Sequence, residues 1–327
     1  MTPAAVCCAL ALAVPHVPPP PAAVRQAVER ALPLLADGAT GHVDQKTCFA
    51  CHNQAFPMAA FRTAKARGFT VQEELIAGQV EHLREFIESN KDAYTSGRGT
   101  GGQVDTAGWL LFTLERAGHK PDELTAAVVE YLLKRDADRD HWRATSNRPP
   151  SEASVFTANY LALRGLKSWG TPEQKDRVNE RVRTVRAWLA ETPAKDTEDR
   201  VYRMRALAEV GAKKATAKAA RELVAAQRPD GGWSQTDKMP SDPYATGTVL
   251  AALAEVGGEK TDSPAYRKGV AYLVRTQRAD GSWFVKSRSR PFQPYYESGF
   301  PHEKNQFISI SASAWATAAL ALACPTK

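Results

Sequence analysis

The chain has 327 residues, of which 43% are hydrophobic and 24% are charged, and its net charge is +7. This length and composition suit a globular protein with one large domain or two ordinary ones. Lys and Arg alternate with Asp and Glu, as in KRDADRD at 134–140. The positive charge therefore predicts solvated helix faces and argues against a nucleic-acid-binding stripe.

Residues 1–22 contain a short apolar run followed by a proline cluster, which predicts a secretory signal peptide and a proline-rich leader. The run is too short to span a membrane, and no later segment offers about 20 uninterrupted apolar residues. We therefore expect a periplasmic or secreted protein with no stable transmembrane segment. Cys7 and Cys8 lie in this leader, and the other three cysteines do not make a disulfide framework.

Residues 23–327 are predicted to form a single helical domain built from a repeated pair of helices. The first helix of each pair is amphipathic and charged, at 22–38, 78–90, 123–136, 176–191 and in the segments before Gln227 and Gln277. The second helix is apolar and rich in small residues, at 53–69, 105–118, 154–166, 199–211, 242–258 and 308–323. One unit is therefore two helices and a loop.

An internal duplication sets the period of these pairs. Segments 220–235 and 269–285 align without a gap, placing Gln227 on Gln277 and Trp233 on Trp283, about 50 residues apart. Each hairpin alone leaves an apolar face uncovered, so six of them are expected to close into a ring with the small-residue helices inside. The predicted fold is an all-α (α/α)6 toroid.

The repeated QxxDGxW segments resemble the QW motif of the prenyltransferase and squalene-oxidase repeat superfamily, which includes terpenoid cyclases and protein prenyltransferases. The resemblance implies that Gln227, Trp233, Gln277 and Trp283 are structural residues that tie successive helices together. Earlier repeats depart from the pattern, because the third keeps Trp142 but has neither Gln nor Gly at the matching places.

The motif Cys48-Phe49-Ala50-Cys51-His52 precedes the first inner helix. Two thiols at this spacing match the two vinyl groups of haem, and the adjacent imidazole matches the proximal iron position, so the motif predicts one haem c held by Cys48, Cys51 and His52. Zinc held by the same residues with a distant fourth ligand is an alternative, and so is a redox dithiol or disulfide.

A second iron ligand is sought among Met58, His42, His141 and His302. Met58 follows His52 by six residues on one helix, about 9 Å along its axis, so it does not reach the opposite haem face. His302 is favoured, because it lies in a long insertion, 286–307, of the kind that often carries function. We also expect a cavity with four possible lining residues, namely Tyr295, Tyr296, Phe300 and Asp242.

A fuller resemblance covers both ends of the chain. Segments 47–69 and 281–320 look like a group of secreted bacterial prenyltransferase or squalene-oxidase repeat proteins that carry a CxxCH motif. The resemblance implies the toroid fold, export and haem attachment, and it implies no particular reaction.

Catalytic motifs are weak in this sequence, so whether the chain is an enzyme is left open. The DxDD acid of squalene-hopene cyclases is absent, and the nearest run, 136–140, reads as a solvated loop. Asp105, Asp199 and Asp242 each open an inner helix and are expected to be N-caps.

The sequence therefore predicts an exported toroid with one c-type haem, for electron transfer or for redox or ligand sensing. It would work with a redox partner protein and hold a cavity for a small hydrophobic or glycan ligand. The alternatives are an enzyme acting on an isoprenoid or glycan at a Cys/His zinc or haem centre, and a non-catalytic interaction scaffold.

Overall fold

A computed structural model describes residues 18–291 and 294–326. Its regular structure is helical, with no strand in these two ranges. Most of the predicted signal peptide and leader, residues 1–17, lies outside the described residues, and the first helix begins at Pro21.

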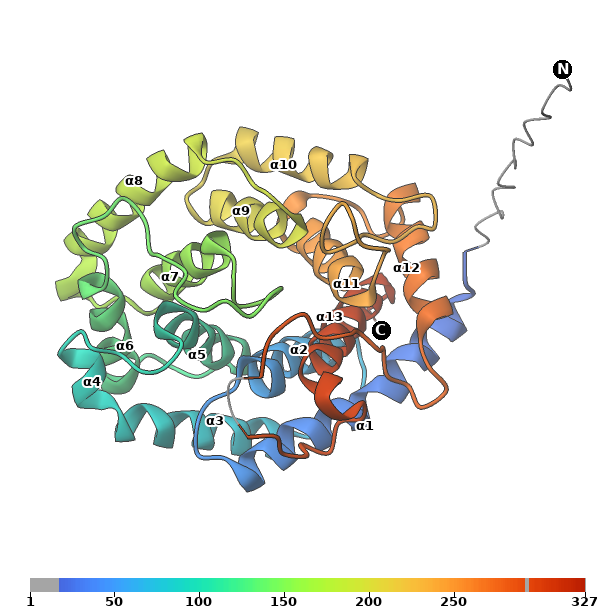
Figure 1. The fold of residues 1–327 in the computed structure, drawn as a ribbon, viewed down its shortest axis with the longest axis horizontal. Helices are drawn as coiled ribbons and strands as arrows, with labels where there is room; N and C mark the ends of the chain where they lie inside the picture. The colour runs from blue at the N-terminus through green and yellow to red at the C-terminus, as the bar shows by residue number, and fades with distance from the viewer. Residues whose placement is uncertain (1–17, 292–293, 327) are drawn as a thin grey trace, which may run out of the picture.

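In the described part of the chain, all the α-helices except the short α4 form two concentric layers (Figure 1). The inner layer consists of α2 (Phe56–Ala66), α5 (Gln103–Ala117), α7 (Val155–Trp169), α9 (Thr197–Glu209), α11 (Pro243–Ala252) and α13 (Gln306–Ala323). The outer layer consists of α1 (Pro21–Gln45), α3 (Glu73–Ser89), α6 (Glu123–Lys134), α8 (Lys175–Glu191), α10 (Lys213–Ala225) and α12 (Pro264–Thr276), with the short α4 (Lys91–Thr95) beside α6. The predicted all-α (α/α)6 toroid is confirmed.

Composition explains which helices lie inside. Every residue of α11 is buried, whereas α8 buries only Val178, Arg181, Val185 and Leu189, the spacing of one helix face. Small residues also let the inner helices approach closely. A Cβ atom on Gly247 of α11 would lie 2.6 Å from the backbone nitrogen of Ala316 in α13, so glycine is required there.

Helix α13 is long and apolar enough to cross a membrane, by length and composition alone. In the ring, 83% of its apolar window is buried against other helices. Its apolarity is therefore that of a core helix.

The tryptophans of the QW segments make one repeated contact. The indole Nε1 of Trp233 donates to Leu223 O at 2.7 Å, and that of Trp283 donates to Leu273 O at 2.8 Å, ten residues upstream in each case. Trp142 makes the same contact to Leu132 O at 2.9 Å, although its repeat lacks the Gln and Gly. The indole is the element of the motif that persists.

The two glutamines of the motif join one unit to the next. Gln227 Nε2 donates to Ala265 O in α12, and Gln277 Nε2 donates to Ala27 O in α1, both at 2.8 Å. Because α12 belongs to the last unit and α1 to the first, Gln277 is placed where the ring closes.

The axis of the ring is packed with side chains. A closed circuit of contacts, each 4.7–6.2 Å between ring centroids or from a guanidinium carbon to a centroid, joins five of the six inner helices. Its members are Phe56, Trp109, Tyr202, Tyr160, Arg205 and Trp315. These six side chains form one packed cluster, called here the axial plug, that links the inner helices.

One of the three predicted helix caps is correct. Asp242 caps α11 by accepting from Ala245 N at 3.0 Å. Asp199 is not a cap, because Asp196 occupies that place and accepts from Asp199 N. Asp105 is not a cap either, because α5 starts after the left-handed Gly102 and leaves Asp105 within its first turn.

Candidate functional site

The CxxCH motif lies at the N-terminal ends of the inner helices. Cys51 opens a π-helical turn, Cys51–Ala55, that continues into α2. Such turns occur frequently at functional sites. Two buried histidines fix the preceding loop, since His42 Nε2 bonds Cys48 O at 2.7 Å and His82 Nε2 bonds Lys46 O at 2.8 Å.

Cys48, Cys51 and His52 all line one cavity of about 850 Å³. Asp105 and Trp109 of α5 form part of its wall, and the loop before α7 contributes Ser146, Asn147, Arg148 and Glu152. The structure therefore brings the three motif side chains to a common space. Cys48 is exposed and Cys51 is buried.

The thiol of Cys51 donates to Glu152 Oε1 at 3.0 Å, across 101 residues of sequence. Burial, together with the Glu152 carboxylate, holds the pKa of Cys51 well above its usual range, so the group is a thiol at neutral pH. Glu152 also pairs with Arg148 through an ion pair and two backbone hydrogen bonds of 3.0 and 3.1 Å. This small bridge shapes the loop that covers the motif.

His52 presents an imidazole nitrogen without a partner. Its Nε2 is buried and makes no hydrogen bond, while its ring packs edge-on against Phe307 at 4.8 Å between centroids. Burial, with smaller contributions from His42 and Arg148, lowers the pKa of His52 to about 3. The ring is therefore neutral at pH 7, which is the form that ligates metals.

Asp105 supplies a buried acid to the same wall. Its Oδ1 is buried without a hydrogen-bond partner. Burial, and then the nearby Glu152 carboxylate, raises the pKa of Asp105 to about 8, so it is mostly protonated at pH 7.

Three of these groups are close enough to share a metal ion. One ligand atom each from Cys51, His52 and Glu152 lie within 4.8 Å of one another. Cys48 is not part of this cluster. Glu152, distant in sequence, therefore lies beside Cys51 and His52, whereas His302 lies at Ser282 in the last QW loop.

The residues considered as a second iron ligand are dispersed. His302 Nε2 bonds Ser282 Oγ at 3.1 Å in the last QW loop, and Met58 is buried in the core. His141 stacks on Trp188 at 4.5 Å. His42 lines the cavity, but both of its nitrogens are bonded, Nδ1 to Tyr296 and Nε2 to Cys48 O.

The four predicted cavity residues also lie apart. Tyr295 lines a neighbouring cavity, described below, and Tyr296 is bound to His42. Phe300 is buried against Gly38 in the core, and Asp242 lines a third hollow, of about 410 Å³, beside Tyr272. Burial raises the pKa of Asp242 to about 6.

Sequence reasoning missed Arg148 and Glu152. Both lie in the stretch 135–154 between α6 and α7, which has no helical pattern. A segment of that length without its own regular structure is uncommon in a compact domain and is a signal of function. The proximity of Glu152 to Cys51 depends on the closure of the ring and could not be predicted from the sequence pattern.

Comparisons with known proteins give a family match for the second half of the chain. Residues 195–321 match the squalene-hopene cyclase C-terminal domain. Drimenyl diphosphate synthase from Streptomyces showdoensis is 30% identical over 213 residues, which is 58% of this chain and 37% of that protein. Squalene–hopene cyclase from Alicyclobacillus acidocaldarius is 43% identical over 65 residues, 20% of this chain. The chain thus spans 37% and 9% of the lengths of these two relatives.

Solved structures agree on the architecture. Type II terpene cyclase MstE from Scytonema superposes with a TM-score of 0.57 at 16% identity, over 94% of this chain and 100% of that one. Unsaturated glucuronyl hydrolase from Bacillus sp. GL1 superposes with a TM-score of 0.52 at 16% identity, over 91% and 96%. At such identities the likeness shows the fold alone, and that fold is the α/α toroid described above.

Proposed function

We propose that this protein binds one c-type haem at the mouth of the toroid and works in electron transfer or in redox or ligand sensing. The observation that carries the proposal is that Cys48, Cys51 and His52 open onto one cavity. Export to the periplasm or beyond the cell, and a redox partner protein, belong to the same proposal.

The residues present fit such a group. The cavity of about 850 Å³ is within the range of about 300–1,000 Å³ typical of ligand and cofactor sites. Cys48 and Cys51 would supply the two thioether links, and His52 would supply its neutral, unpartnered Nε2 to the iron. Haem iron supplies one-electron redox chemistry when it is bound.

The chain's own groups would adjust in a defined way. A thioether at Cys51 has no S–H, so Glu152 would lose its present donor and keep its ion pair with Arg148. None of Met58, His141 and His302 lines the cavity, and His42 is held by two hydrogen bonds. His52 is thus the histidine of this cavity that would be available to the iron.

The second candidate is an enzyme that acts on an isoprenoid in the same cavity with a zinc-type metal centre. The cluster of Cys51, His52 and Glu152 favours it, because three protein ligands and one open position are typical of catalytic zinc. The named relatives include a drimenyl diphosphate synthase and a squalene–hopene cyclase. Asp105, protonated at neutral pH, is the acid that the cavity offers to such a reaction.

One set of variants separates these candidates. The protein is exported in a host with c-type haem maturation machinery, and haem and metals are measured by pyridine haemochrome spectrum and elemental analysis. Haem attachment predicts about one haem per chain, with loss of covalent attachment in both Cys48→Ala and Cys51→Ala. Cys324→Ala removes a buried cysteine outside the motif and should leave the haem in place.

Zinc binding predicts a different pattern. Zinc would be lost in Cys51→Ala and in Glu152→Gln, but it would be retained in Cys48→Ala, because Cys48 is outside the ligand cluster. Absence of haem after maturation would overturn the leading proposal. Absence of both haem and zinc would leave the interaction scaffold as the remaining reading.

A further inference from the structure

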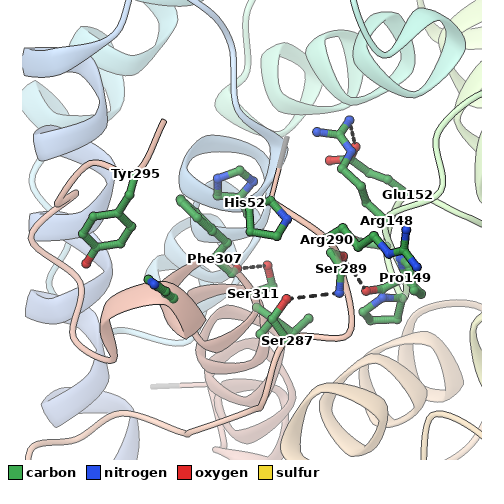
Figure 2. Close-up of a pocket in the computed structure, with 15 residues that line it drawn as sticks. His52, Arg148, Pro149, Glu152, Ser287, Ser289, Arg290, Tyr295, Phe307 and Ser311 are labelled. Carbon is green, nitrogen blue, oxygen red and sulfur yellow. Dashed lines mark hydrogen bonds and ion pairs between the residues drawn. The ribbon is translucent and has the colours of Figure 1, made fainter. Parts of the chain in front are cut away.

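A second cavity, of about 340 Å³, is also lined by His52 of the motif (Figure 2). It is formed by the loop before α7, by the insertion before α13 and by the first turns of α13. His52, Arg148, Glu152 and Arg290 line both this cavity and the larger one. The two cavities therefore share a wall at the candidate haem ligand.

The walls of this cavity are fixed by hydrogen bonds between its loops. Ser289 Oγ donates to Pro149 O at 3.0 Å, across 140 residues, and Ser289 N donates to Ser287 Oγ at 3.2 Å. Ser311 Oγ donates to Phe307 O within α13 at 2.7 Å. These serine hydroxyl and amide protons are already used, so the inner surface is mainly apolar, with Pro149, Phe307 and Ile308 facing the space.

The charged groups of this cavity do not balance. Arg148, Arg290 and Lys304 line it, with Glu152 as the one lining carboxylate. Glu152 pairs with Arg148, and His52 is neutral at pH 7. Within the described ranges no carboxylate forms an ion pair with Arg290 or Lys304, both of which are exposed at the rim. An apolar interior thus meets a positively charged rim.

We propose that this cavity binds a small amphiphilic anion, with its apolar chain against Phe307 and Ile308 and its anionic head group at Arg290 and Lys304. If each ligand atom takes about the 30 Å³ of a water molecule in the liquid, the space holds at least about eleven non-hydrogen atoms. An eight-carbon chain with a carboxylate is therefore a suitable probe. The proposal goes beyond the haem site and does not require that haem be bound.

The experiment compares three probes that share one chain, namely octanoate, octyl phosphate and octanol. Binding is measured by isothermal titration calorimetry on the full chain at low ionic strength. Two exposed charge pairs of ordinary strength predict that octanoate binds about 3- to 10-fold more tightly than octanol. In the double variant Arg290→Gln, Lys304→Gln this preference should disappear, while octanol affinity stays unchanged.

The matched control is Lys260→Gln, which removes an exposed lysine that lines none of the cavities described above. It should keep the preference for octanoate. Octyl phosphate binding that depends on Arg290 and Lys304 would support the anion site and identify a phosphate head group as tolerated. Equal binding of octanoate and octanol, or a preference that survives in the double variant, would overturn the proposal. Because haem is not read out here, this result stands apart from that of the cysteine variants.

Discussion

Four buried groups at the mouth of the ring have pKa values that burial moves in opposite directions. Burial lowers the pKa of His52 to about 3 and that of His42 to about 4, and it raises that of Asp105 to about 8 and that of Asp242 to about 6. Below pH 6.5 the unfolded chain protonates the histidines that the folded chain keeps neutral, so their contribution to stability rises with pH. The carboxyls stay protonated in the folded chain after the unfolded chain has lost those protons, so their contribution falls with pH.

Between about pH 4 and 6, the rise in stability from the two histidines nearly cancels the fall from the two carboxyls. Between pH 6.5 and 8, Asp105 is the one of these four groups that still changes its protonation in the folded chain. The contribution of Asp105 to stability should fall there by about 1.4 kcal/mol per pH unit, or about 2 kcal/mol over that window. Asp105→Asn removes this slope, so we expect the variant to gain about 2 kcal/mol relative to the parent from pH 6.5 to 8. Urea unfolding at several pH values measures it.

Asp44→Asn is the control for Asp105→Asn, because Asp44 is exposed on α1. It should leave the slope of the unfolding free energy against pH unchanged. A parent protein whose stability is flat from pH 6.5 to 8 would show that Asp105 is ionised in the folded chain.

At the scale of elements, the QW segments act through equivalent contacts in successive units. The backbone N–H of Trp142, Trp233 and Trp283 donates to Asn159 Oδ1, Thr246 Oγ1 and Ser313 Oγ, at 2.9–3.0 Å, in each case a side chain of the following inner helix. The indole N–H of each tryptophan donates to the preceding outer helix, and its backbone N–H donates to the following inner helix. One tryptophan thereby fixes the loop in each of these three hairpins.

Gln277→Ala is expected to destabilise the fold by about 1–3 kcal/mol, because it removes the two hydrogen bonds that the side-chain amide donates to Ala27 O of α1 and to Gly281 O. Gln227→Ala removes the equivalent bonds and should cost a similar amount. Gln277 contacts α1, whereas Gln227 contacts α12. Only Gln277→Ala should therefore speed hydrogen exchange of the backbone amides in α1.

Gln72→Ala is the control for these glutamine variants, since the exposed Gln72 side chain caps no helix. It should change the free energy of unfolding by less than about 0.5 kcal/mol. An unchanged exchange rate of the α1 amides in Gln277→Ala would show that ring closure does not depend on this residue.

The helices could be predicted from the sequence because the two layers differ in composition. The inner helix α11 is apolar all round, whereas the outer helix α8 has apolar residues on one face only. The site could be predicted only in part. Spacing identified Cys48, Cys51 and His52, but the Cys51–Glu152 contact spans 101 residues and depends on how the ring closes. His302 was favoured for its place in a long insertion, yet the positive φ of 87° at that residue and its bond to Ser282 direct it to the QW loop.

At the scale of the whole molecule, the ring has two unlike ends. The cavities lie at the N-terminal ends of the inner helices, whereas a charged network lies toward their C-terminal ends. Glu255 accepts from Arg205 at 2.6 Å and from Arg116 at 2.9 Å. Arg205 is also a member of the axial plug, with a side chain only 2% exposed. Glu255 thus neutralises two arginines near the C-terminal ends of α9 and α5.

Glu255→Gln is therefore expected to cost about 3–5 kcal/mol at pH 7, because it leaves a buried arginine without its carboxylate. Burial opposes ionisation of Glu255, but Arg205 and Arg116 hold its pKa at about 2. Its folded pKa is depressed, so its stabilising contribution is present above about pH 4.5 and is lost as the pH falls toward 2. The variant should consequently lose less stability on acidification than the parent does.

Urea unfolding of the parent and of Glu255→Gln at pH 7 and pH 3 tests both statements. Glu191→Gln, at an exposed position at the end of α8, serves as the control and should follow the parent at both pH values. If Glu255→Gln unfolded within about 0.5 kcal/mol of the parent at pH 7, the axial arginine would need another source of compensation. The plug would then owe its stability to aromatic packing around Trp109 and Trp315, and the charged network would be a peripheral feature of the ring.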